Sequence, residues 1–380
     1  MRYCVVGAGF SGAVIARRLA DAGHRVLVVD ERTHLAGNCH TARDVQTGVM
    51  THVYGPHIFH TSDERVWDYI RRFGDMIPYN HRVQAVTTRG VFSLPLNLLT
   101  INQFFGKTMG PAEARAFIAQ KATPIADPRN FEEQGLALMG EELYRAFFAG
   151  YTAKQWGMDP KALPASILKR LPARFDYNDS YFAHRWQAMP RDGYTAIVEK
   201  IFEAPGIELR LACRFEDLDE RFAHIVYSGP VDRFFNFDLG RLGYRTLDFE
   251  TFVETGDYQG TAVLNYCDPA VPFTRITEHK HFAPWEKDGF EKTICYREFS
   301  RNAGEADIPY YPIRLVDEQK MLRDYIARAR ATPGVSFVGR LGTYRYLDMD
   351  VTIGEAITAG DVLIDAIAAG RSAPAFFVEP

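Results

Sequence analysis

The first eighty residues combine short apolar runs with one amphipathic stretch, in the order strand, helix, strand. The runs at 3–6 and 26–29 are typical of buried strands, and residues 13–22 between them have helical spacing. Residues 54–61 are too rich in Gly, Pro and His for an ordinary helix, and a helix is predicted over 66–70. The pattern therefore indicates a βαβ unit at the start of the chain.

The middle of the chain changes from alternating to helical character. Residues 79–96 predict a hairpin with Val83, Ala85 and Val91 facing inward. Residues 98–172 read mostly helical, with one helix over 112–121 and another capped by Asn130, followed three residues later by Glu133. That second helix carries apolar residues at helical spacing at positions 136, 139, 143 and 147.

The second half alternates apolar and polar positions over several short segments. A buried strand is predicted at 224–229, and a mostly antiparallel sheet is predicted from segments 245–253, 261–266, 273–282 and 292–299. A helix over 319–330, a strand at 335–339 and a helix over 353–367 complete the chain. Strands at both chain ends would then belong to one sheet, with two insertions between them.

Composition narrows the function classes. The chain has 380 residues and a net charge of −4, which disfavours nucleic acid as the main partner. Its five cysteines show no C-x-x-C spacing, so we expect neither a metal site nor a disulfide framework. No apolar run approaches bilayer length, and a strand begins almost at Met1, so we expect a cytoplasmic protein without a membrane anchor or leader.

Three glycines follow the first strand with G-x-G-x-x-G spacing. Gly7 permits a tight turn, Gly9 admits a pyrophosphate, and Gly12 lets the helix approach the strand. The helix N-terminus attracts anions, and Asp30 after the second strand can accept hydrogen bonds from a ribose. This predicts an α/β fold with a Rossmann-like domain that binds FAD or NAD.

Several motifs together resemble the UDP-galactopyranose mutases over nearly the whole chain. They are GAGFSGAV at 7–14, GPHIFHT at 55–61, YTAKQW at 151–156, MPRDGYT at 189–195, YYPI at 310–313 and GRLGTYRYLDMD at 339–350. One departure is Ala36, where that family usually has a second glycine. The resemblance implies an FAD-binding domain from residues 1–78, 190–230 and 331–380. It also implies a helical domain at 98–175, and a sheet domain from 79–97, 176–189 and 231–330.

The resemblance also implies which residues hold the cofactor, FAD in its reduced form. The ADP half would lie against the glycine motif and the end of the second strand, and the flavin against two later segments. The implied residues are Gly7, Gly9, Phe10, Ser11, Gly12, Asp30, Glu31, Arg32, Gly37, Asn38, His57, Ile58, Arg340, Tyr346, Asp348 and Met349.

For the substrate, the resemblance implies UDP-galactose in its pyranose and furanose forms. The reduced flavin N5 would attack C1 and displace UDP, giving a flavin iminium that holds the open sugar. Arg170 and Arg275 would clamp the diphosphate, with His60 near the flavin. The remaining pocket residues would be Phe147, Tyr151, Thr152, Trp156, Tyr181, Asn265, Tyr311 and Tyr346.

Several alternatives stay open at this point. Phe147 could serve helix packing, and either Tyr310 or Tyr311 could contact the diphosphate. A mutase for another nucleotide sugar, an oxidoreductase like the flavin amine oxidases, or a non-catalytic dinucleotide-binding protein would share the first motif. We expect NAD(P)H or another reductant, a homodimer, and a role in supplying galactofuranose for surface glycans.

Overall fold

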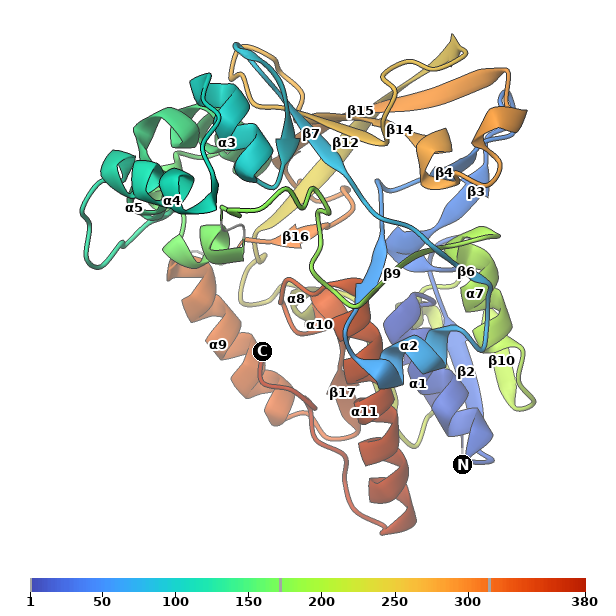
Figure 1. Ribbon diagram of the computed structural model, residues 1–380. Coiled ribbons are helices and arrows are strands. Elements are labelled where there is room, and N and C mark those ends of the chain that lie inside the picture. The colour runs from blue at the N-terminus through green and yellow to red at the C-terminus, as the bar shows by residue number, and fades with distance from the viewer. Residues whose placement is uncertain (1, 171–172, 314–315) are drawn as a thin grey trace.

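The computed structural model describes residues 2–170, 173–313 and 316–380. A five-stranded parallel sheet lies in the lower half of Figure 1, and a seven-stranded sheet lies in the upper half. The parallel sheet has the order β10-β2-β1-β11-β17. Its strands are β1 Arg2–Val6, β2 Arg25–Val29, β10 Ile207–Arg210, β11 Ile225–Tyr227 and β17 Val335–Phe337. The α/β fold built from both chain ends is therefore confirmed.

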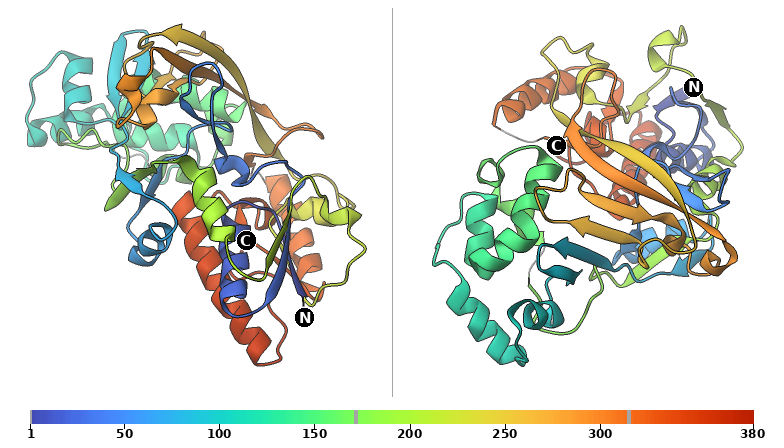
Figure 2. Two further views of the ribbon diagram at one scale, coloured as in Figure 1. Left: turned by 90° about the vertical axis from the view of Figure 1, so that its right-hand side faces the viewer. Right: turned by 90° about the horizontal axis from the view of Figure 1, so that it is seen from above.

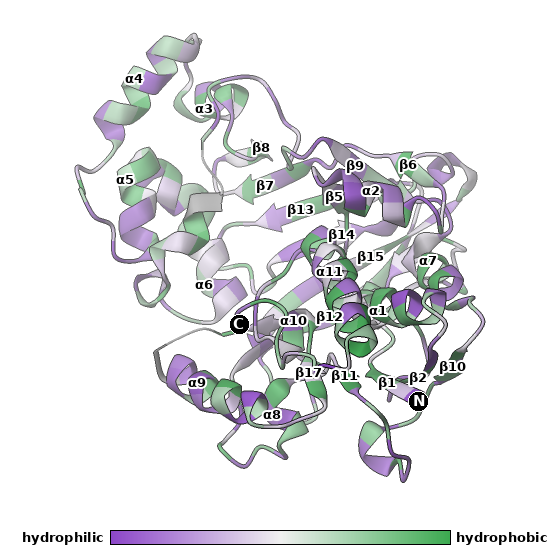
Figure 3. Cartoon of the chain, turned by 90° about the horizontal axis from the view of Figure 1, so that it is seen from below, coloured by the Kyte–Doolittle hydropathy of each residue, from purple (hydrophilic) through white to green (hydrophobic). Residues whose placement is uncertain are grey.

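Helices cover this sheet on both sides, which explains why the central strands β1 and β2 are largely apolar runs. Side chains of α1 Phe10–Asp21, α7 Gly193–Phe202 and α11 Met349–Ala368 share one hydrophobic cluster with Val5 and Val28. Figure 3 shows the hydrophobic residues of α1 and α11 side by side. On the other side, α9 Val316–Arg330 packs through Leu322 and Tyr325 against Phe337.

The seven-stranded sheet has the order β16-β12-β15-β14-β13-β7-β8, and only β13 and β7 pair in parallel. Figure 2 shows this sheet from above, with the long strands β12 and β15 across it. The strands are β7 Val83–Thr87, β8 Gly90–Leu94, β12 Tyr244–Thr255, β13 Val263–Tyr266, β14 Arg275–Glu278, β15 Lys292–Asn302 and β16 Tyr311–Pro312.

Two small sheets and short helices connect these layers. The strands are β5 Phe59–Thr61, β9 Trp186–Pro190 and β6 Met76–Pro78 in one sheet, and β3 Thr41–Arg43 and β4 Met50–His52 in the other. The connecting α-helices are α2 Glu64–Ile70, α8 Val231–Phe234 and α10 Gly339–Gly342. Short 3-10 helices cover Gly37–Cys39, Phe215–Asp217, His279–Phe282 and Lys287–Gly289.

A group of helices lies at one side of the seven-stranded sheet (Figure 1). Asn130 caps α5, since its side chain accepts a hydrogen bond from the Glu133 N–H, while the Glu133 carboxylate accepts from the Arg129 N–H. The helices are α3 Leu98–Phe105, α4 Pro111–Lys121, α5 Phe131–Leu143 and α6 Gly150–Trp156, with a π-helix at Tyr144–Ala149 and 3-10 helices at Pro160–Ala162 and Ala165–Arg170.

Three expectations about local structure were wrong. Val91 is 58% exposed, because Phe92 and Leu94 on the edge strand β8 face the core instead. The predicted strand 273–282 ends at Glu278, and His279–Phe282 forms a 3-10 helix. The apolar helical face through residues 136–147 is not one helix, because Gly140 has a φ of +77° and a π-helix follows.

Two further points concern the molecule as a whole. The predicted domain boundaries place residues 231–330 with the antiparallel sheet, whereas the side chains of α9 contact the parallel sheet. The division into domains remains a prediction. No helix within 2–170, 173–313 or 316–380 is long and apolar enough to cross a membrane.

Candidate functional site

The glycine-rich loop owes its shape to close backbone contacts. Gly7 has a φ of +106°, a conformation that favours glycine. A Cβ at Gly12 would lie 1.9 Å from the Gly7 carbonyl oxygen, so α1 can approach β1 only with glycine there. Gly9 is the N-cap of α1 and offers no side chain to the first N–H groups of the helix. These N–H groups are available for an anion such as a pyrophosphate.

Polar groups at the end of β2 continue this cradle. The Asp30 carboxylate accepts hydrogen bonds from the N–H groups of Ala8 (2.7 Å) and Arg32 (2.9 Å), so it also orders the loop. Arg32 donates to Asn38 Oδ1 (2.9 Å), and its guanidinium lies 4.8 Å from the Tyr54 ring centroid. Arg32 Nη1 is buried without a hydrogen-bond partner among the described residues. This unsatisfied cationic donor fits a phosphate-bearing cofactor.

The other predicted cofactor residues lie around this cradle in different ways. Phe10 is buried edge-on to Tyr194, and Ser11 lies next to Gly339 at the start of α10. Glu31 forms a double hydrogen bond with Arg233 (2.8 Å each) at the surface. Ile58 and Met349 are partly buried against the core. Ala36 takes a φ of +71° beside Gly37, so the position where the family usually has glycine does adopt the left-handed conformation.

His57 lies partly buried next to the cradle. Its Nδ1–H donates to the Gly55 carbonyl (2.9 Å), and its backbone N–H donates to His52 Nδ1 (3.3 Å). Burial and the nearby Arg340 guanidinium lower the pKa of His57 to about 4, so the ring is neutral at physiological pH. The same Arg340 charge acts on Cys39, whose pKa burial raises to about 12. His57, Cys39 and Arg340 therefore meet at one place.

His60 lies three residues after His57, in strand β5. Its Nδ1 is 3.1 Å from His184 Nδ1, and its ring stacks on Phe182 at 3.7 Å. Burial lowers the pKa of His60, while the carboxylates of Asp348 and Asp350 oppose this shift. Ligand atoms of His60, His184 and Asp350 lie within 4.8 Å of one another. In the His60–His184 contact, the Nδ1–H of one ring donates a hydrogen bond to the Nδ1 of the other.

A row of three polar residues crosses the seven-stranded sheet. Asn265 on β13 is the register partner of Arg275 on β14, which is the partner of Glu298 on β15. Arg275 Nε lies 3.0 Å from Glu298 Oε1, an ion pair in which Glu298 is 2% exposed and Arg275 22%. Asn265 Oδ1 is buried without a partner among the described residues. The row presents a cation and an unsatisfied acceptor side by side.

Tyrosines surround Arg275. Burial alone would lower the pKa of its guanidinium, but the Glu298 carboxylate and the hydroxyls of Tyr151, Tyr311 and Tyr181 together raise it. Tyr311 also stacks on Tyr346 at 5.6 Å. The side chains of Arg275, Tyr151, Tyr181, Tyr311 and Tyr346 are called the tyrosine–arginine cluster below.

Arg340 connects this cluster to the cofactor cradle. Its guanidinium lies 5.4 Å from the Tyr311 ring and 5.2 Å from the Tyr346 ring. It donates to the carbonyls of Tyr310 (3.2 Å) and Leu347 (2.6 Å). Tyr310 itself is 4% exposed and lies beside Tyr54. Of the two adjacent tyrosines, Tyr311 is therefore the one that neighbours Arg275.

The residues predicted for the uridine side differ in how far they are buried. Phe147 is 2% exposed and packs against Phe92 and Phe104, both at 5.5 Å, as a core residue does. On α6, Thr152 is buried and Trp156 is partly buried against the same core. Arg170 closes a 3-10 helix, but its side chain lies outside the described part of the structure.

Four residues of this region were missed by sequence reasoning. His184 contacts His60, and Glu298 forms an ion pair with Arg275. Lys154 and Arg245 form hydrogen bonds that connect helix α6 to the seven-stranded sheet. Lys154 lies inside the quoted motif at 151–156, which was a usable signal. Glu298 had no local signal, because only strand register places it opposite Arg275.

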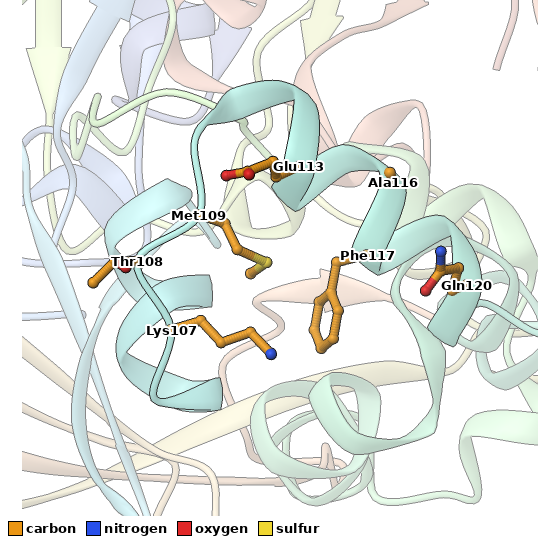
Figure 4. A pocket seen from close by; sticks show the side chains of 7 residues that line it. All are labelled: Lys107, Thr108, Met109, Glu113, Ala116, Phe117 and Gln120. Carbon is orange, nitrogen blue, oxygen red and sulfur yellow. The ribbon is translucent and has the colours of Figure 1, made fainter.

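A surface hollow lies elsewhere, between the end of α3 and helix α4. Figure 4 shows Lys107, Met109 and Phe117 among the side chains that line it. None of its lining residues was predicted to bind cofactor or substrate. This hollow is therefore separate from the cradle and the tyrosine–arginine cluster.

Comparisons with known proteins show which family the chain resembles. Residues 146–346 match the family described as UDP-galactopyranose mutase, and residues 5–73 match an NAD(P)-binding Rossmann-like domain. The chain is 55% identical over 376 residues to a probable UDP-galactopyranose mutase of Klebsiella pneumoniae, covering 98% of this chain and 97% of that protein. It is 48% identical over 372 residues to the dTDP-fucopyranose mutase of Escherichia coli, covering 96% and 98%.

Solved structures share the fold as well. A crystal structure of reduced UDP-galactopyranose mutase matches with a TM-score of 0.72 at 15% identity, covering 97% of this chain and 94% of that one. The family model spans more than half of the chain, and the match at 55% identity spans nearly all of it. The chain belongs to the UDP-galactopyranose mutase family.

Proposed function

We propose that this chain interconverts UDP-galactopyranose and UDP-galactofuranose with reduced FAD bound in the glycine cradle. The observation that carries the proposal is the tyrosine–arginine cluster, in which Arg275 is held by Glu298 and surrounded by tyrosine hydroxyls. A permanent cation and hydroxyl donors stabilise the negative charge that develops on a leaving diphosphate. Family membership supplies the substrate class.

FAD is the cofactor we propose, because the cradle offers helix N–H groups and the unsatisfied Arg32 Nη1 to its pyrophosphate. When bound and reduced, it would supply a nucleophilic nitrogen to C1 of the sugar. Of the predicted set, the glycine loop, Asp30, Arg32 and Asn38 would hold the ADP half. His57, Arg340 and the start of α11 would lie at the flavin half.

The chain's own residues would then act on the substrate. Arg275, with the predicted partner Arg170, would stabilise the diphosphate as the bond from C1 to its oxygen breaks. Tyr181, Tyr311 and Tyr346 would donate hydrogen bonds to the same group. Tyr151, Thr152, Trp156 and Asn265 would bind the uridine side, while the packing of Phe147 gives it a supporting role.

Chromatography of UDP-galactofuranose incubated with the purified yellow protein, with and without dithionite, tests the proposal. Conversion to UDP-galactopyranose only under reduction is the expected result. Arg275→Ala should keep bound FAD and lose about 100- to 1000-fold in turnover. Arg297→Ala removes a more exposed arginine from the same strand β15 that carries Glu298 and should react like wild type. Arg275→Ala with full turnover would refute the clamp.

A second candidate is a dTDP-fucopyranose mutase, which the 48% identical relative favours. The same chemistry would apply to that nucleotide sugar, so both substrates belong in one assay under equal conditions. A larger kcat/KM for the dTDP-fucose pair would assign that substrate instead. A cytoplasmic location, a homodimer and NAD(P)H as reductant stay predictions from the sequence.

A further inference from the structure

Lys154 on α6 makes an unusual set of contacts. Its ammonium donates to four backbone carbonyls in the turn between β13 and β14, those of Tyr266 (2.7 Å), Asp268 (2.9 Å), Val271 (2.9 Å) and Phe273 (3.0 Å). An ammonium has three N–H groups, so four acceptors surround it as they would surround a bare cation. Within the described ranges, no carboxylate lies within 4.0 Å of this ammonium.

A cation is well suited to binding several carbonyl oxygens at one point, because its charge offsets the repulsion between the carbonyl dipoles. The turn therefore has a cation-binding shape, and its cation is a side chain from another element. We call the four carbonyls the carbonyl cradle. Burial lowers the pKa of Lys154, so these carbonyls replace part of the hydration that the ammonium has lost.

The carbonyl cradle adjoins the proposed substrate site on both sides. Tyr266 directly follows Asn265, and Phe273 comes two residues before Arg275. Tyr151 lies three residues before Lys154, one turn away on the same helix α6. A single ammonium thus joins the helix that carries Tyr151 to the hairpin that carries Asn265 and Arg275.

Other contacts hold the two ends of α6. A Cβ at Gly150 would lie 2.3 Å from the Cys267 carbonyl oxygen, so the helix start touches the hairpin turn directly. At the other end, the Gln155 carbonyl accepts from Ser300 Oγ (2.7 Å) and from Arg245 Nε (3.2 Å). The Lys154 ammonium is the polar contact between the middle of the helix and the hairpin.

We propose that the carbonyl cradle is a cation site filled by Lys154, and that Lys154 is thereby a positioning residue for nucleotide binding. It sets the separation between Tyr151 on one side and Asn265 with Arg275 on the other. The nucleotide part of this inference rests on the proposed function, whereas the cation site rests on the carbonyl geometry.

The test uses the FAD-containing protein and three variants. Lys154→Ala empties the carbonyl cradle, Lys154→Met fills it with an uncharged chain of similar length, and Lys161→Ala removes an exposed lysine nearby as a control. UDP affinity is measured by calorimetry, and the melting temperature is measured in the same buffers. The added cations are potassium, propylammonium and, at equal ionic strength, tetramethylammonium, which has no N–H and is too large for the site.

Lys154→Ala should bind UDP about tenfold more weakly or worse. Potassium or propylammonium should restore its affinity and raise its melting temperature, and tetramethylammonium should do neither. Lys154→Met should stay weak in every salt, and Lys161→Ala should match wild type. A Lys154→Ala variant with wild-type UDP affinity would overturn the positioning role.

Failure of every cation to change the Lys154→Ala variant would overturn the cation site, because the loss would then come from packing alone. If wild type itself fails to bind UDP, the proposed function is wrong instead. The cation dependence of the melting temperature in Lys154→Ala would still decide whether the carbonyl cradle binds cations. The two failures are therefore separable.

Discussion

The glycine-rich loop and the tyrosine–arginine cluster hold their geometry by different physics. In the loop, backbone touches backbone, and the space for a Cβ at Gly12 is taken by the Gly7 carbonyl. In the cluster, charges meet across strands, as the partly buried Arg275 does with the buried Glu298. Contacts of the first kind tolerate no added atom, whereas contacts of the second kind depend on every partner being present.

Gly12→Ala should disrupt the packing of the glycine-rich loop and cause the largest loss of unfolding free energy among the variants described below. A Cβ at 1.9 Å from a backbone oxygen forces α1 away from β1, which should cost about 3 kcal/mol or more of unfolding free energy. Urea unfolding of the cofactor-free protein measures this without a contribution from FAD. Gly289→Ala, with open space around its Cβ, should stay within about 0.5 kcal/mol of wild type. Equal stability of the two variants would contradict the steric explanation.

Arg245→Met tests how much a buried charged side chain between strand β12 and helix α6 contributes to stability. The Arg245 side chain is 2% exposed and bonds to Gln155 O, Ser300 Oγ and Asn302 Oδ1, with no carboxylate among these partners. Its loss removes these hydrogen bonds together with the packing of a side chain that is almost fully buried, which should cost about 2–4 kcal/mol. Chemical unfolding checks the value, and Arg297→Met at a more exposed site is the control. A stable Arg245→Met protein would show that α6 needs no anchor at its end.

Histidines with lowered pKa values make the folded protein sensitive to acid. Burial lowers the pKa of His279 to about 3, and burial with the Arg340 charge lowers that of His57 to about 4. Their unfolded pKa is near 6.5, so the unfolded chain binds protons first as the pH falls. Stability is thus complete above about pH 6.5, and each histidine removes up to about 1.4 kcal/mol per pH unit below it.

Urea unfolding at a series of pH values between 4 and 7.5, in about half-unit steps, measures this slope. His279→Asn retains an acceptor for the His52 N–H, which now donates to His279 Nδ1 (3.2 Å). The variant should have a shallower slope by one histidine's share. An unchanged slope would mean that His279 already titrates normally in the folded protein.

Ala36→Gly tests the backbone strain at this position, and we expect the smallest change in stability from it. Ala36 has a φ of +71°, where a Cβ is strained and glycine is not. Because glycine also gains freedom in the unfolded chain, the net stabilisation should be about 0.5 kcal/mol. Ala327→Gly, on the exposed face of α9, should instead lose about 1 kcal/mol. Thermal unfolding of both proteins side by side checks the opposite signs.

The sequence predicted the parts whose structure is encoded locally. The glycine spacing, the apolar runs of β1 and β2 and the Asn130 cap each follow from contacts within a few residues, and each was confirmed. The turn at Gly140 and the inward face of β8 were mispredicted, because a π-helix and an edge strand are decided by neighbouring elements. The motifs also contain the glycine loop, Tyr151, Tyr311, Arg340 and Tyr346 of the candidate site.

Only the tertiary structure decided how those residues meet. Arg275 and Glu298 lie on different strands, and only their register makes them neighbours. The carbonyls that bind Lys154 belong to a turn more than a hundred residues further along the chain. Steric contacts such as that of Gly12 with Gly7 act between residues close in the sequence, so a sequence motif can predict them. Pairing of buried charges acts through space, so it becomes visible only once the chain has folded.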